Sequence, residues 1–160
     1  MTYRVDIIVY EYFSKLNYGE KSVYLKKFFI GITGLGDSLW YFLIFLLVFS
    51  LAYILKKITL ISLDVYYYLK KISFFGFAYL LSVGLVTQII KHLVGRPRPN
   101  HTLLDGSFEL NFFTTESSFH SFPSGHSSTI VAISLIASLT LPSLKFYFFT
   151  CGLLVALSRV

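Results

Sequence analysis

The sequence predicts an all-α membrane protein, built as a polytopic bundle of transmembrane helices. Its 160 residues are 55% hydrophobic and 14% charged, with a mean hydropathy of +0.68; soluble domains carry about 25% charged residues. The apolar residues gather into uncharged runs that have lysines at their ends. The formal charge of +6 therefore indicates contact with lipid headgroups and not with nucleic acid.

The first part of the chain, residues 1–38, mixes charges with aromatic and aliphatic residues. It lacks the basic start and continuous apolar core of a cleavable signal peptide. Gly31, Gly34 and Gly36 interrupt its most apolar stretch, a pattern that predicts an interfacial helix followed by a bend. We expect 1–38 to be an N-terminal interfacial segment and 39–160 to be the main domain.

Two uncharged runs predict the first two spans. Residues 39–55 are followed by Lys56, and residues 72–90 are followed by Lys91. Each run approaches the roughly 20 residues that a helix needs to cross the hydrocarbon core. Small residues inside the second run are compatible with close approach of a neighbouring membrane helix.

Two further runs predict a third and a fourth span. Residues 127–141 are apolar or hydroxylated and stop at Pro142, which cannot continue a helix interior without losing a hydrogen bond. Residues 146–157 are apolar but short, so this helix has to recruit flanking residues to cross the membrane. The chain is thus expected to hold about four spans.

The long polar segment 91–126 holds all four histidines and three of the four prolines. Long loops between well-formed helices are usually functional or disordered. With four spans, the short 56–71 loop and Lys145 lie on the opposite side of the membrane from this segment. Lysines close to the membrane are more numerous on that opposite side, so the positive-inside rule places the long loop on the non-cytoplasmic face of an inner membrane.

A first candidate motif opens the long loop. Lys91 stands at the expected helix end and Arg98 follows seven positions later, directly before Pro99. Two cations held near each other favour an anion between them, and an arginine fork matches phosphate oxygens. A solvated basic helix end is the alternative interpretation of this segment alone.

A second candidate motif closes the loop directly before an apolar helix, with the residues Pro123, Ser124, Gly125 and His126. Serine supplies a hydroxyl, glycine lets the backbone come close to a ligand, and the helix N-terminus adds free N–H groups and a favourable dipole. This combination is typical of a phosphate site. The alternative is a plain helix cap made by Ser124 or Ser127.

Together these residues resemble the first two motifs of the type 2 phosphatidic acid phosphatase and vanadium haloperoxidase superfamily, in its membrane lipid phosphatase branch. The third motif of that family is Ser-Arg followed by a histidine, with an aspartate further on. Ser158 and Arg159 match its start, and Val160 is the last residue. The resemblance covers about 39–160, implies a six-helix-type core, and leads us to expect a chain truncated before the third-motif histidine.

The resemblance also implies residue roles. Lys91, Arg98 and Arg159 would bind the phosphoryl oxygens, Ser124 and the Gly125 amide would donate hydrogen bonds, and His126 would protonate the leaving oxygen. The family uses no metal or other cofactor, and its nucleophile is the third-motif histidine, which forms a phosphohistidine. His92, His101 and His120 receive no role, and we assign no metal site.

The expected function is hydrolysis of a phosphate monoester or pyrophosphate on a membrane lipid. Phosphatidate, phosphatidylglycerophosphate, undecaprenyl pyrophosphate and lipid A phosphates are all candidate substrates. A catalytically inactive phosphate or headgroup binder is the main alternative. A small anion transporter predicts basic residues inside the spans, but 39–55 and 72–90 contain none. Haloperoxidase chemistry fits the motifs, although that branch is typically soluble.

Overall fold

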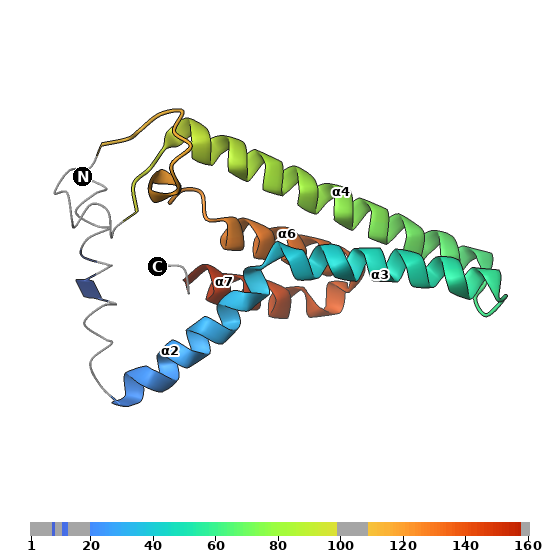
Figure 1. Cartoon of the computed structure of the whole chain (residues 1–160). Helices are drawn as coiled ribbons and strands as arrows, with labels where there is room; N and C mark the ends of the chain where they lie inside the picture. Colours follow the sequence, from blue (N-terminus) through green and yellow to red (C-terminus); the bar gives the residue numbers. More distant parts are fainter. Residues whose placement is uncertain (1–7, 9–10, 13–19, 99–108, 158–160) are drawn as a thin grey trace.

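A computed structural model of the chain describes residues 8, 11–12, 20–98 and 109–157, and the regular elements in these ranges are helices. Helices α3 (Ser38–Lys57) and α4 (Leu63–Val94) form one antiparallel hairpin, and α6 (Gly125–Thr140) and α7 (Lys145–Leu157) form another beside it (Figure 1). Helix α2 (Glu20–Thr33) runs obliquely up to α3. The described part is therefore the all-α bundle that the sequence predicts.

The segment before α3 bends where the glycines stand. Helix α2 runs through Gly31 and is followed by the 3₁₀ turn η2 (Gly34–Gly36). Asp37 then adopts an extended conformation, and its carboxylate accepts a hydrogen bond of 3.0 Å from the backbone N–H of Leu39. This N-cap satisfies one of the free donors at the start of α3 and sets a new helix direction.

The two long helices extend beyond the uncharged runs that predict them. Helix α4 has 32 residues and begins at Leu63, well before the run 72–90. The basic and tyrosine residues of its first turns stay helical; the Lys56 ammonium lies 4.3 Å from the centroid of the Tyr66 ring. Such residues suit the headgroup region, where a helix continues although the apolar run has ended.

Helices α3 and α4 are each long and apolar enough to cross a membrane. The predicted third and fourth spans correspond to α6, with 16 residues, and α7, with 13 residues, joined by the 3₁₀ turn η4 (Pro142–Leu144). Both are shorter than the roughly 20 residues of an ordinary span. The chain is a helical membrane bundle in which one hairpin is much longer than the other.

Small residues bring the helices together. On α4 the buried positions are Ser73, Gly76, Leu80 and Thr87, which fall on one face at helical spacing. A side chain at Gly76 would overlap the Phe45 ring of α3. Between the two shorter helices, the Ser134 hydroxyl donates a 3.0 Å hydrogen bond to the backbone carbonyl of Phe148. Close contact through small and hydroxylated residues is the usual way membrane helices associate.

Candidate functional site

The end of α4 presents Lys91 in the last helical turn. Gly95 ends the helix in the left-handed conformation, with φ of 52°, and its N–H donates a 3.0 Å hydrogen bond to the Lys91 carbonyl. The Gly95 carbonyl accepts a 2.9 Å bond from Asn111. A Cβ atom at Gly95 would overlap the Asn111 carbonyl, so glycine is needed here both for its conformation and for its lack of a side chain.

The start of α6 is capped by Ser124, one of the two caps anticipated from the sequence. Its hydroxyl accepts a 3.4 Å hydrogen bond from the N–H of Ser127, and its carbonyl accepts from the N–H and the hydroxyl of Ser128, each at 2.9 Å. The cap fixes where the helix begins, so Gly125 and His126 occupy the first turn. That turn carries the positive end of the helix dipole.

Backbone hydrogen bonds tie the two motifs to each other. The N–H of Arg98 donates to the Ser118 carbonyl at 2.9 Å. The Arg96 carbonyl accepts from both the N–H and the hydroxyl of Ser121, at 3.1 and 2.9 Å. The Arg96 guanidinium lies 5.9 Å from the Phe122 ring centroid. The chain leaving α4 is thereby paired with the chain entering α6, and the two helix ends are held side by side.

A cavity of about 270 Å³ lies where these helix ends meet. The ammonium of Lys91 lies 3.8 Å from the point that a Cβ at Gly125 would occupy, so it stands over the first turn of α6. His126 lines the same cavity and is half-buried. The other lining residues come from the start of α3, from α4 and from α6: Gly36, Asp37, Ser38, Phe42, Leu80, Val83, Gly84, Thr87, Gln88, Ser128 and Thr129.

The turn η2 packs directly on the histidine. Gly36 is buried, and a Cβ there would lie only 2.6 Å from the Cβ of His126. Residues 36–38, which the sequence analysis assigns to the edge of the N-terminal segment, therefore line the cavity. The sequence analysis missed Thr87 and Gln88 as well, although two polar residues within the apolar run 72–90 were a usable signal.

The structure brings together some of the predicted site residues and not others. Lys91, Gly125 and His126 line the cavity, and Ser124 adjoins it as the cap of α6. Arg98 is exposed and is absent from the cavity lining. Arg159 lies outside the described residues.

Two histidines without a predicted role meet beside the site. The rings of His92 and His120 lie 4.4 Å apart, centroid to centroid. His92 Nδ1 lies 2.8 Å from the Gln88 carbonyl, and His120 Nε2 lies 3.1 Å from the Thr114 carbonyl. The contact braces the loop against the end of α4. Within the described ranges, no group of three or more His, Cys, Asp or Glu residues is arranged to hold a metal ion; His101 is outside these ranges.

A second, open groove of about 370 Å³ adjoins the cavity between α4 and α6. It shares Val83 and Ser128 with the cavity lining and continues along the two helices away from the loop. Its other lining residues are Tyr79, Ser127, Val131 and Ala132. The surface of this groove is mostly apolar.

The fold and the site define a polytopic helical membrane protein with a motif-bearing cavity at one end of its bundle. Residues 72–160 match the sequence model of the PAP2 superfamily. The chain belongs to this family, as the two motifs lead us to expect.

Two relatives are similar over most of the chain. Both are named Lipid A 1-phosphatase, one from Rhizobium etli and one from Rhizobium johnstonii, and each is 33% identical over 132 residues, or 81% of this chain. The chain spans about half the length of these curated relatives, since the matched region covers 56% and 54% of them. No solved structure gives a significant match.

Proposed function

We propose that the protein is a phosphatase that hydrolyses a phosphate monoester or pyrophosphate on a membrane lipid, releasing phosphate, without a metal ion. Membership of the PAP2 superfamily and the names of the two relatives support a lipid phosphate as the substrate. One observation carries the proposal: Lys91, the first turn of α6 and His126 converge on a single cavity at the end of the bundle. These groups have the chemistry needed to bind a phosphate ester and to protonate its leaving oxygen.

Phosphate binding is proposed to involve two positive groups, the Lys91 ammonium and the N-terminus of α6, and the open space beside Gly125. The Lys91 ammonium and the N-terminus of α6 face the same space, and each attracts an anion. Gly125 keeps that space open because it has no side chain. As charge develops on the phosphoryl oxygens in the transition state, fixed donors of this kind stabilise it without reorganising. Arg98 and Arg159 are proposed as further ligands of the same phosphoryl group.

His126 is proposed to protonate the leaving oxygen. An imidazole titrates near neutral pH, so a protonated ring can transfer its proton to the departing lipid oxygen. The close packing of Gly36 on His126 restricts where the ring lies. The nucleophile is proposed to be the third-motif histidine, which would form a phosphohistidine that water then hydrolyses. Ser158 and Arg159 match the start of that motif.

The lipid tail is proposed to lie in the groove between α4 and α6. This arrangement lets the phosphate reach the cavity while the apolar chain stays in the bilayer. The site lies at the opposite end of the bundle from the adjoining ends of α3 and α4, which carry four lysines, so the positive-inside rule favours a non-cytoplasmic site. The relatives' names make lipid A 1-phosphate the first substrate to test, followed by phosphatidate, phosphatidylglycerophosphate and undecaprenyl pyrophosphate.

The direct test is phosphate release from the four candidate substrates, beginning with lipid A and dioleoyl phosphatidate, in detergent micelles containing a metal chelator. The protein is expressed from its full reading frame and compared with its His126→Ala form. Release by the wild type that is lost in His126→Ala supports the proposal. If the wild type binds the lipids but releases no phosphate from any of the four candidate substrates, the protein is a headgroup binder instead.

A further inference from the structure

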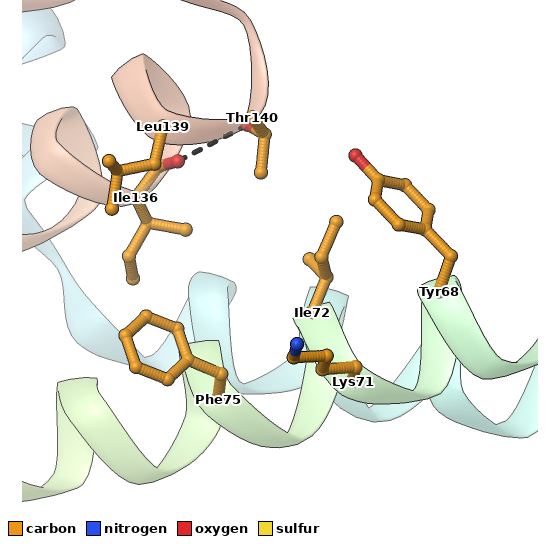
Figure 2. Close-up of a pocket in the computed structure, with 7 residues that line it drawn as sticks. All are labelled: Tyr68, Lys71, Ile72, Phe75, Ile136, Leu139 and Thr140. Carbon is orange, nitrogen blue, oxygen red and sulfur yellow. Dashed lines mark hydrogen bonds between the residues drawn. The ribbon is translucent and has the colours of Figure 1, made fainter.

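A groove of about 420 Å³ lies between α4 and the C-terminal end of α6, away from the candidate active site (Figure 2). Figure 2 shows Phe75 of α4 facing Ile136 and Leu139 of α6. Tyr68, Lys71, Ile72 and Thr140 complete the lining. None of these residues lines the cavity that contains His126, so the two spaces are separate.

The groove exists because the two hairpins differ in length. Helix α4 has 32 residues, or about 48 Å at 1.5 Å per residue, whereas α6 has 16 residues, or about 24 Å. Figure 1 shows the α3–α4 hairpin extending past the turn that joins α6 to α7. Helix α6 is thus shorter than the roughly 30 Å hydrocarbon core. Beyond its end, the apolar face of α4 has no α6 residues to pack against.

The lining has the polarity of a lipid site. Phe75, Ile136 and Leu139 give it apolar walls, while the Lys71 ammonium and the Tyr68 hydroxyl stand toward the start of α4. The Thr140 hydroxyl already bonds to the Ile136 carbonyl of its own helix, at 3.2 Å. The groups left for a ligand are therefore a cation and a phenol, both of which donate hydrogen bonds to an anion.

The charges around the groove favour an anionic headgroup. The last turn of α3 carries Lys56 and Lys57, and the first part of α4 carries Lys70 and Lys71, against Asp64 as the acidic residue of that region. Of these lysines, Lys71 lines the groove, and one basic residue near the membrane surface gains about fivefold in affinity for an anionic lipid. Charge complementarity thus selects an anionic lipid over a zwitterionic one.

We propose that this groove binds a resident anionic glycerophospholipid. One acyl chain lies between Phe75, Ile136 and Leu139, and the phosphate accepts hydrogen bonds from Lys71 and Tyr68. The lipid fills the space that the short α6 leaves beside α4 and so supports the longer hairpin. It is not the substrate, since its phosphate lies at the other end of the bundle from His126. The proposal stands independently of the proposed phosphatase activity.

The test is native mass spectrometry of the detergent-purified protein after incubation with equimolar palmitoyl-oleoyl phosphatidylglycerol and phosphatidylcholine. We expect one retained phosphatidylglycerol per chain, preferred about fivefold. Lys71→Gln should remove that preference, whereas Lys57→Gln, which changes a lysine outside the lining, should leave it in place. Leu139→Trp should fill the groove and abolish retention of either lipid, whereas Leu135→Trp on the same helix should not.

Both controls are chosen at exposed positions, so the variants should stay folded, as elution volume and melting temperature will show. Equal effects of Lys71→Gln and Lys57→Gln would mean diffuse attraction to the surface and would overturn the proposal. Retention of lipid by Leu139→Trp would also overturn it. So would a dimer that Leu139→Trp dissociates, because a second copy of the chain would then occupy the groove.

Discussion

The ammonium of Lys91 lies 3.8 Å from the point where a Cβ atom at Gly125 would stand. Lys91 comes from the end of α4 and Gly125 from the start of α6, so the contact joins the two motifs across the loop between them. The lysine charge and the N-terminal end of the helix dipole add in the same small space. A phosphate in this space would interact favourably with both groups.

Replacing the lysine by an apolar side chain of similar length should abolish phosphate turnover but preserve the fold. We expect Lys91→Met to lower kcat/KM for lipid phosphate release by about 100-fold or more, the usual loss when one fixed electrostatic donor is removed. Methionine and lysine have similar helix propensities, so the melting temperature should hardly change. Lys70→Met, at the other end of α4, is the matched control. An unchanged kcat/KM in Lys91→Met would rule out the proposed role.

The contact between Gly36 and His126 offers a test with a built-in control. A methyl group at Gly36 would lie 2.6 Å from the His126 Cβ, whereas a methyl at Gly34 meets nothing within 4 Å. Gly36→Ala should therefore push the histidine out of place, cost about 1–3 kcal/mol through overpacking, and reduce phosphate release. Gly34→Ala lies in the same turn and should alter neither property. Equal behaviour of the two variants, in melting temperature and in activity, would show that η2 does not position His126.

The groove of about 370 Å³ beside the site predicts that kcat/KM depends on the length of the lipid's acyl chains. Val131 lines this groove and is 49% exposed, so a larger side chain there should be tolerated. Val131→Trp should block the groove and lower kcat/KM about tenfold for dioleoyl phosphatidate, but leave short-chain dibutyroyl phosphatidate nearly unaffected. Leu135→Trp, on the same helix but outside the groove, should leave both unaffected. An equal loss on both substrates would mean that the tail lies elsewhere.

The sequence predicted the helical elements and the two motifs because both depend on local pattern. Uncharged runs marked α3, α4, α6 and α7, and each motif was formed by residues within eight positions of the chain. The boundary of α4 at Leu63 could not be predicted from the apolar run, because lysines and tyrosines that end such a run remain helical at the headgroups. Charge marks the end of the hydrocarbon region and not the end of the helix.

The packing of η2 on the site could not be predicted in the same way. Gly36 and His126 are distant in the sequence, and a glycine just before a helix cap gives no indication of which residue will approach it. Thr87 was different. It stands inside an apolar run and proved to be a buried polar residue lining the cavity, so the pattern contained a signal that the sequence analysis did not use.

The last prediction concerns Gly95, which ends α4 and directs the chain into the loop. Its φ of 52° is unfavourable for other residues, and a Cβ there would overlap the Asn111 carbonyl. Gly95→Ala should therefore destabilise the protein by about 1–3 kcal/mol from the backbone conformation alone, with a further cost from the overlap. Because the same turn positions Lys91, phosphate release should fall together with the melting temperature.

Gly31→Ala in α2 is the control for Gly95→Ala, since a methyl at Gly31 meets nothing within 4 Å and alanine favours a helix interior by up to about 1 kcal/mol. It should leave the melting temperature unchanged or raise it. If Gly95→Ala melts at the wild-type temperature and keeps its activity, the left-handed turn is not what holds the first motif in place. If it keeps activity but melts lower, the turn stabilises the loop without positioning Lys91. Only a loss of phosphate release together with a lower melting temperature supports the conclusion that the end of α4 positions the site.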